Sequence, residues 1–255
     1  MSGIFDGIAD VGRSEEIASL AIGKVKENWD EKHPGMVKVE YFLGTTGKNV
    51  SAWVPVVMPY AGNGYGNYFL PEIGSTVVLG FNMGDRNMPI VLGCLWNDVN
   101  KLPANTAAKE NPKKLVKTKG GNEVLLSDEK KKELISAHTP QGLTIKLSDE
   151  KQNITITDKN SKNLLEIKAK DGHVRLAAAS KITLECGGAA VTIDGKAKKL
   201  TLSMNQIEIK GSQTVKINGQ STNISGSMVE VKGSGQLKLD GGGMAMLKAG
   251  MVKIN

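Results

Sequence analysis

From Leu143 to the end of the chain, two apolar residues separated by a single residue recur, with polar residues between successive pairs. The pairs are Leu143/Ile145, Ile154/Ile156, Leu165/Ile167, Val174/Leu176, Ile182/Leu184, Val191/Ile193, Leu200/Leu202, Ile207/Ile209, Val215/Ile217, Val229/Val231, Leu237/Leu239 and Val252/Ile254. Alternation with a period of two indicates half-buried β-strands, and repetition at a longer spacing indicates one structural unit stacked many times. The pattern therefore predicts a long, regular stack of short strands.

Two absences from this segment agree with a strand stack. No Phe, Tyr or Trp lies between Asn97 and Asn255, and all eight prolines lie at or before Pro140. Proline lacks the N–H group that a strand ladder needs, so its absence leaves every ladder hydrogen bond possible. The lack of aromatic rings favours a narrow core filled by small aliphatic side chains.

A single copy of this stack is not expected to be stable. Two aliphatic side chains per repeat bury too little apolar surface to offset the entropy lost when a strand and its turn become ordered. Several chains around one axis remove this deficit, because each apolar face then meets the others. We therefore predict an obligate homotrimer that forms an intertwined triangular β-helix, a β-prism needle. Its predicted core consists of Val174, Leu176, Ile182, Leu184, Val191, Ile193, Leu200, Leu202, Ile207, Ile209, Val215, Ile217, Val229, Val231, Leu237 and Leu239.

The first part of the chain has a different texture, with short apolar runs punctuated by glycine-rich and polar turns. We expect strands near Ala21–Lys26, Val37–Phe42, Ala52–Val57, Thr76–Phe81 and Pro89–Leu95. Short strands at this density, separated by turn signals, are typical of a small closed barrel of the OB type. The predicted fold class is thus all-β, with an N-terminal OB-fold barrel followed by the trimeric β-helix.

Four segments follow from these patterns. We expect an N-terminal arm at residues 1–19, the OB-fold domain at 20–97, a linker or collar at 98–117 and the needle at 118–255. The formal charge of +7 lies on the last segment, because residues 1–117 carry as many basic as acidic residues. The word Leu-Ser-Asp-Glu-Lys occurs twice near the start of the needle, at 126–130 and at 147–151.

No arrangement of residues in the sequence indicates catalysis. His33, His138 and His173 are scattered, and the two cysteines, Cys94 and Cys186, lie in no metal-ligand spacing. We therefore predict no catalytic residues, no cofactor and no dedicated metal ligands, and expect that the chain is not an enzyme. An ion held on the axis by one residue from each copy is left open by the sequence.

The excess of lysine raises the alternative of an OB-fold nucleic-acid-binding protein. The lysines alternate with aliphatic residues along the strands, and the needle has no aromatic rings on which bases could stack. We favour a solubilising outer face and expect no nucleic-acid partner. The N-terminal sequence carries acids where a secretory signal has an apolar core, so we expect synthesis in the cytoplasm.

The C-terminal residues change to a glycine- and methionine-rich sequence. An open end of a strand stack is an unpaired edge, and methionine adapts well to binding surfaces. We expect a platform for a tip protein at Met251, Val252, Lys253, Ile254 and Asn255, with a frayed cap as the alternative.

The barrel segment resembles the OB domain of the central spike proteins of contractile injection systems, which include VgrG proteins and phage baseplate assembly protein V. The motifs that carry the resemblance are IGKV at 22–25, GMVKV at 35–39, AWVPV at 52–56, PEIGSTVVLGF at 71–81 and PIVLGCLW at 89–96. The repetitive tail, including the final Val-Lys-Ile-Asn, is similar to theirs as well.

The resemblance implies a non-enzymatic, membrane-puncturing trimeric spike at the centre of a baseplate, which transmits the force of sheath contraction to the target envelope. It implies a hub or baseplate protein at the OB end, a PAAR-like tip protein at the C-terminal end and transient contact with the target membrane. Large hub domains precede the OB domain in VgrG proteins but not here, so a short form with a separate hub protein is expected. The protein would assemble into the baseplate of a phage tail-like particle or virion and be delivered into or through the envelope. The main alternative is a trimeric tail fibre or adhesin.

Overall fold

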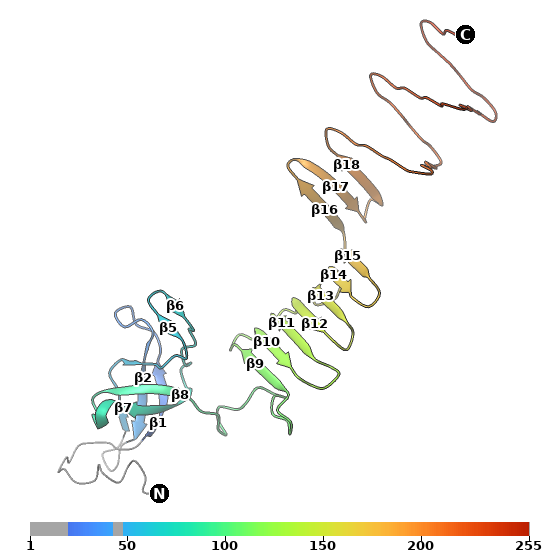
Figure 1. Cartoon of the computed structure of the whole chain (residues 1–255). Helices are drawn as coiled ribbons and strands as arrows, with labels where there is room; N and C mark the ends of the chain where they lie inside the picture. The colour runs from blue at the N-terminus through green and yellow to red at the C-terminus, as the bar shows by residue number, and fades with distance from the viewer. Residues whose placement is uncertain (1–19, 43–47, 255) are drawn as a thin grey trace, which may run out of the picture. The chain divides into compact units, whose positions relative to one another are not determined.

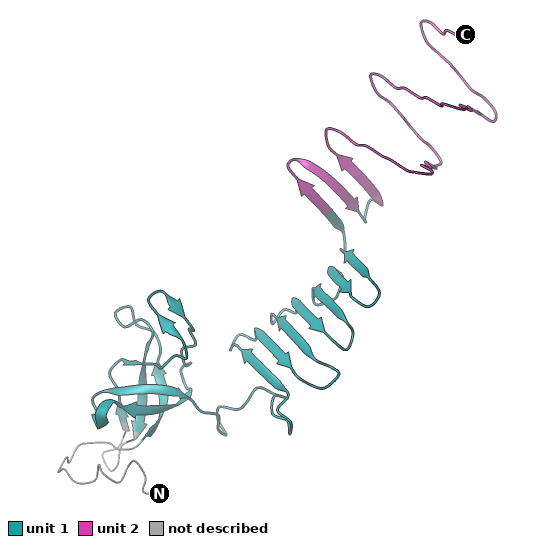
Figure 2. Cartoon of the chain, viewed as in Figure 1, with its two compact units in different colours: residues 1–182, 194–197 teal, residues 183–193, 198–255 magenta. Residues whose placement is uncertain are grey.

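The computed structural model describes residues 20–42 and 48–254 (Figure 1). The described chain consists of strands and connecting loops, with one short 3-10 helix at Asn82–Gly84. It divides into two compact units, one from residues 1–182 and 194–197 and one from residues 183–193 and 198–255 (Figure 2). The predicted all-β fold class is confirmed. The predicted N-terminal arm lies outside the described residues.

An antiparallel barrel forms the beginning of the first unit. Its main sheet has the order β3-β2-β1-β7-β8, and β4 pairs with β2. The strands are β1 (Ala21–Glu27), β2 (Met36–Phe42), β3 (Lys48–Val50), β4 (Val54–Pro55), β7 (Thr76–Phe81) and β8 (Pro89–Cys94). A parallel bridge between Val56 and Val91 joins the segment after β4 to β8, and the Val57 N–H donates to the Val91 carbonyl at 2.8 Å. This contact joins β8 to the chain that follows β4, which is paired with β2, and so closes the sheet as a barrel requires.

The barrel encloses a compact aliphatic core. The buried hydrophobic residues are Ala21, Val25, Val37, Val39, Tyr41, Val54, Val77, Leu79 and Val91. Gly23 lies against this core, where a Cβ atom would collide with Val39 Cγ1. Four of the five predicted strands occur with only small differences at their ends.

The predicted strand at Ala52–Val57 is wrong in its extent, because two short strands, β3 and β4, flank a break there. Ser51 causes the break: the Val39 N–H donates to the Ser51 hydroxyl at 2.9 Å, and the Ser51 N–H donates to the Val39 carbonyl. The Ser51 hydroxyl thus takes the place of a backbone carbonyl as the acceptor for the Val39 N–H. The glycine-rich segment expected to be a turn contains the small hairpin of β5 (Ala61–Gly62) and β6 (Tyr65–Gly66).

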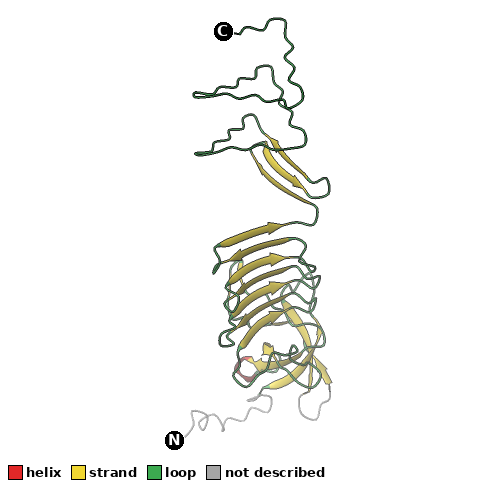
Figure 3. Ribbon diagram, turned by 90° about the vertical axis from the view of Figure 1, so that its right-hand side faces the viewer, coloured by secondary structure: helices red, strands yellow, loops and turns green. Residues whose placement is uncertain are grey.

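A second sheet of seven antiparallel strands follows the barrel. Its strands are β9 (Lys113–Lys117), β10 (Glu123–Ser127), β11 (Leu134–His138), β12 (Thr144–Ser148), β13 (Asn153–Thr157), β14 (Leu164–Lys168) and β15 (His173–Ala177). Each strand pairs with the next along the chain, so the sheet is a simple meander whose strands lie one above another (Figure 3). β9 lies inside the segment 98–117 that we expected to be a linker, so the stack begins earlier than predicted.

The repeated Leu-Ser-Asp-Glu-Lys word forms the turns after β10 and β12. In each copy the serine is the last residue of the strand and its side chain is buried, with Ser127 and Ser148 both 7% exposed. The Glu129 N–H donates to the Ser127 hydroxyl, and the Lys151 N–H donates to the Ser148 hydroxyl at 3.3 Å. Both copies thus place a buried serine at the end of a strand, where its hydroxyl accepts a hydrogen bond from a turn N–H two residues later in the first copy and three residues later in the second.

Three more strands, β16 (Lys181–Cys186), β17 (Ala189–Asp194) and β18 (Lys199–Ser203), form a small sheet in sequence order. Beyond Ser203 no strand is present among the residues described, up to Ile254. The chain runs back and forth there as an extended trace (Figure 1). The strands that the sequence predicts from Ile207 to Ile254 thus have no ladder partner within the described chain.

Candidate functional site: the apolar face of the strand stack

The seven-stranded sheet has one strongly apolar face, which the strand register defines. Because successive residues of a strand point to opposite sides, residues aligned across neighbouring strands share a face. One aligned row consists of Val116, Val124, Ala137, Ile145, Ile156, Leu165 and Leu176. The row beside it consists of Lys114, Leu126, Ile135, Leu147, Ile154, Ile167 and Val174. We call these two rows the apolar face.

Most aliphatic side chains of the apolar face are open to solvent. Their exposed fractions run from 38% for Ile167 to 63% for Val174. The buried hydrophobic residues of the described chain all belong to the barrel, between Ala21 and Val91. The stack therefore has no apolar core of its own among the residues described. A sheet face of this kind is stable in water only when another element covers it.

The register confirms part of the predicted pattern. Ile154/Ile156, Leu165/Ile167 and Val174/Leu176 lie on the apolar face. Leu143 precedes β12 and is not part of the strand. The pair on the apolar face there is Ile145/Leu147, so the predicted pair Leu143/Ile145 is wrong and lies two residues too early in the sequence.

The predicted list of apolar pairs begins at Leu143 and leaves out the first three strands of the face, although β10 and β11 lie within the needle expected at 118–255. In β10 three apolar residues occur in a row, Val124 to Leu126, which hides the alternation. In β11 the step Ile135/Ala137 ends on a small alanine, and the adjacent Leu134 points to the opposite face, so the alternation is weak there. These strands could have been found by pairing residues at equal distances before and after each predicted turn, because the apolar residues of neighbouring strands are then aligned.

The opposite face is mainly polar and carries paired charges. Glu123 lies between Lys117 and His138, with its carboxylate oxygens 2.9 Å from Lys117 Nζ and 3.5 Å from His138 Nε2. The hydrogen bond from Lys117, assisted by the electrostatic influence of Lys117 and His138, holds the pKa of Glu123 below its ordinary value. Lys146 and Glu166 lie on the same face, on either side of Thr155. This charged side is suited to contact with water.

The second unit also exposes apolar side chains that nothing covers in the described chain. Leu184, Cys186, Ala189, Ala190, Val191 and Met204, together with Glu185, line a shallow hollow of about 270 Å³. The predicted core residues Ile207, Ile209, Val215 and Ile217 are 51–69% exposed. Of the predicted tip residues, Met251, Val252 and Ile254 are exposed and Lys253 lies between them, whereas Asn255 is outside the described residues. The assignment of these residues to a core or a tip stays a prediction.

The described part of the chain brings no metal-binding chemistry together. No group of three or more His, Cys, Asp or Glu side chains in residues 20–42 and 48–254 is placed to hold a metal ion. Both cysteines are free thiols. None of the helices in that part of the chain is long and apolar enough to cross a membrane. The dominant feature is thus the exposed apolar face, built from aliphatic side chains in register.

Fold and surface together define a class of protein: a small β-barrel joined to an all-β stack that presents an open apolar face. Comparison with known proteins is specific about the barrel. Residues 21–96 match the family described as the type VI secretion system/phage-baseplate injector OB domain. The predicted resemblance to central spike proteins of contractile injection systems is thereby confirmed for this domain.

Relatives of known identity agree with this assignment. The chain is 34% identical over 113 residues to the type VI secretion system spike protein VgrG5 of Pseudomonas aeruginosa, which covers 41% of this chain and 14% of that protein. It is 29% identical over 152 residues to spike protein VgrG1c of the same organism, covering 55% of this chain and 20% of that protein. A third relative is the actin cross-linking toxin VgrG1 of Vibrio cholerae, 29% identical over 130 residues, 48% of this chain and 12% of the toxin. The chain is VgrG-like, and it spans at most a fifth of the length of these three relatives.

Proposed function

We propose that three copies of this chain pack their apolar faces around one axis and form the central spike of a contractile injection system. The open, in-register apolar face carries this proposal, because it leaves the stack without a core in a single copy. Three sheets arranged as the walls of a triangular prism cover all three faces at once, with the polar faces outward. Closed cyclic symmetry of this kind is common among soluble homo-oligomers.

The two parts of the stack form ladders in different ways in this proposal. From β9 to β15 each strand pairs with its neighbours in the same chain, so each copy supplies one complete wall. Beyond Ser203 the extended segments have no partner in the described chain, so strands of the neighbouring copies pair with them. The chains are thus intertwined in the distal part and side by side in the proximal part.

The function that follows is mechanical. Ladders completed between the copies around a dry aliphatic axis would leave no soft hinge along the trimer, so that a push at one end is transmitted to the other. The OB barrels, which match an injector domain family, would attach the spike to a hub or baseplate protein. We propose that sheath contraction drives this spike into the target envelope, with which it makes transient contact.

The far end of the spike is proposed to hold a PAAR-like tip protein on the residues from Met251 to Asn255. Exposed methionine and aliphatic side chains at an unpaired strand edge support such a platform. Truncation after Gly250 is expected to abolish co-purification with the tip protein while the assembly keeps its mass. Retention of the tip protein by the truncated assembly would refute the platform and leave a frayed cap as the better account.

An injection assay tests the whole function. Particles assembled with the wild-type chain should deliver their contents to target cells, whereas particles with a variant that cannot trimerise should not form a complete baseplate. Full delivery by particles that lack this chain would contradict the proposal.

A further inference from the structure

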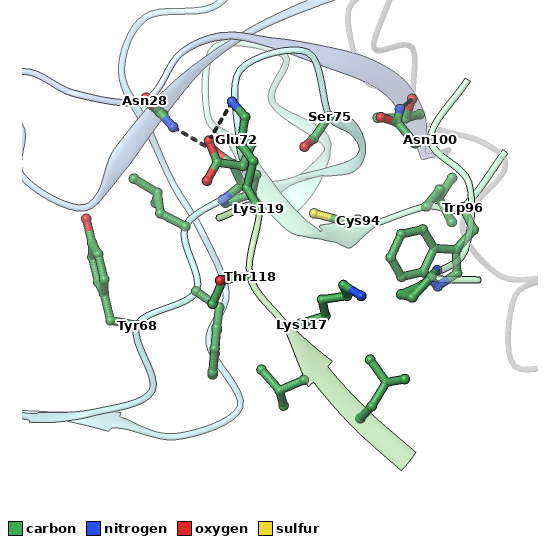
Figure 4. Close-up of a pocket in the computed structure, with 18 of the residues that line it drawn as sticks. Asn28, Tyr68, Glu72, Ser75, Cys94, Trp96, Asn100, Lys117, Thr118 and Lys119 are labelled. Atoms are coloured by element: carbon green, nitrogen blue, oxygen red, sulfur yellow. Dashed lines mark hydrogen bonds and ion pairs between the residues drawn. The ribbon is translucent and has the colours of Figure 1, made fainter. Parts of the chain in front are cut away.

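A large hollow lies between the OB barrel and the edge of the seven-stranded sheet, within the first unit (Figure 4). Its volume is about 810 Å³, and barrel residues, the segment after the barrel and β9 all line it. Its aromatic lining comes from Trp29, Tyr68, Phe69 and Trp96. Cys94, the last residue of β8, is also part of the wall.

The four aromatic side chains are unusually open. Trp29 is 77%, Tyr68 72%, Phe69 61% and Trp96 64% exposed, and none of them belongs to the barrel core. They therefore contribute little to the stability of the barrel itself. A cluster of exposed aromatic residues marks an interaction surface, because Trp and Tyr supply large contact areas at interfaces.

The β9 side of the hollow has unpaired backbone. β9 is the last strand in the order of its sheet and pairs only with β10 in the described chain. Leu115, Val116 and Lys117 of β9 line the hollow, so its free edge borders the aromatic cluster. A free strand edge beside apolar side chains accepts an extended segment from another chain.

Continuity with the apolar face identifies the occupant. Val116 both lines the hollow and begins one row of the apolar face, next to Val124. A chain that covers the face from its first strand onward must therefore also reach the hollow. Lys119 and Glu72 also line the hollow, and they form an ion pair in which Lys119 Nζ lies 3.5 Å from a Glu72 carboxylate oxygen.

We infer that a second copy of this chain fills the hollow in the assembled protein and buries the four aromatic side chains. The inference rests on the proposed trimer and adds a specific contact to it. Each barrel is then held against the base of a neighbouring copy as well as its own, so that load passes between copies at the junction.

Cys94 reports directly on this contact. In the single chain the walls of the hollow partly desolvate the exposed thiol, which raises its pKa. In a Cys186→Ser background Cys94 is the only thiol, because the chain has two cysteines. Its rate of alkylation by iodoacetamide at pH 8 can then be compared between the assembly and a chain dissociated by Ile156→Asp, which leaves the barrel core unchanged. Labelling in denaturant provides the fully open reference.

We expect Cys94 in the assembly to react more slowly than in the dissociated chain by roughly tenfold or more, because reaction then requires local opening. Adding Trp96→Ala should raise the rate in the assembly while light scattering still gives a three-copy mass, since the stack holds the copies together. Equal rates in an intact three-copy assembly and in the dissociated chain would overturn the filled hollow but not the trimer. A one-copy mass for the parent chain would overturn both.

Discussion

A single charge placed on the apolar face tests whether that face is buried in the functional protein. Ile156 lies in the middle of the seven-stranded sheet, aligned with Ile145 on one side and Leu165 on the other. Its side chain is 46% exposed in the single chain. The perturbation is Ile156→Asp, and the matched control is Thr155→Asp, which places the same charge one residue earlier on the opposite face between Lys146 and Glu166.

The expected magnitude follows from this exposure. Full burial of an isoleucine side chain stabilises a protein by roughly 1.5–3 kcal/mol, so covering the exposed part of Ile156 contributes about 1 kcal/mol per copy. Across three copies its loss costs about 3 kcal/mol, and each buried carboxylate adds a dehydration penalty of several kcal/mol. If the face were not covered, the same substitution would change the stability of one copy by only about 0.5 kcal/mol or less, as is usual at a solvent-exposed site.

Size-exclusion chromatography and thermal melting measure the outcome. Ile156→Asp should dissociate the assembly or lower its melting temperature strongly, whereas Thr155→Asp should keep both mass and melting temperature. The milder Ile156→Val should lower stability by about 0.5–1.5 kcal/mol per copy without dissociation. If Ile156→Asp and Thr155→Asp behave alike, the face is not buried and the reasoning fails.

Three further predictions concern other parts of the chain. Gly23→Ala should destabilise the barrel by about 1–3 kcal/mol in thermal melts, because the added methyl group meets Val39 in a filled core; an unchanged melt would mean that the core yields freely. Because its folded pKa is lowered, Glu123 stabilises the fold above its ordinary pKa of 4.5, and this contribution disappears as the pH falls through the lowered value. Glu123→Gln should therefore remove on the order of 1 kcal/mol per chain of stability at pH 7 and flatten the loss below pH 4.5, whereas an unchanged pH profile would assign no role to the pair with Lys117. Amide hydrogens of residues 204–254 should exchange roughly a hundredfold more slowly in the assembly than in the dissociated chain, and equal rates would exclude ladders between copies.

Much of the barrel and the stack could be predicted from local patterns. A short apolar run between turn signals located β7 at Thr76–Phe81, and alternation with a period of two located the face pairs of β13 to β15, because each of those three strands has one apolar and one mainly polar side. The break at Ser51 could not be predicted, since it depends on a side-chain hydrogen bond to the backbone of Val39 in the neighbouring strand β2.

Two features of the candidate site depend on how chains and sheets are placed together. The change from paired strands to unpaired extended segments after Ser203 is not visible in the repeat, since the apolar pairs continue unchanged across it. The aromatic hollow is equally hidden, because Trp29, Tyr68 and Trp96 are far apart in the sequence and meet only through the barrel topology. Their exposure, rather than their spacing, reveals the surface.

The central claim is that three copies share one apolar axis. Light scattering of the purified full-length chain in solution tests it most directly. The account predicts a mass three times the 27.2 kDa of one chain, unchanged on dilution over the working concentration range. A mass equal to that of a single chain would contradict it, and a two-copy mass would replace the triangular prism with a pair of facing sheets.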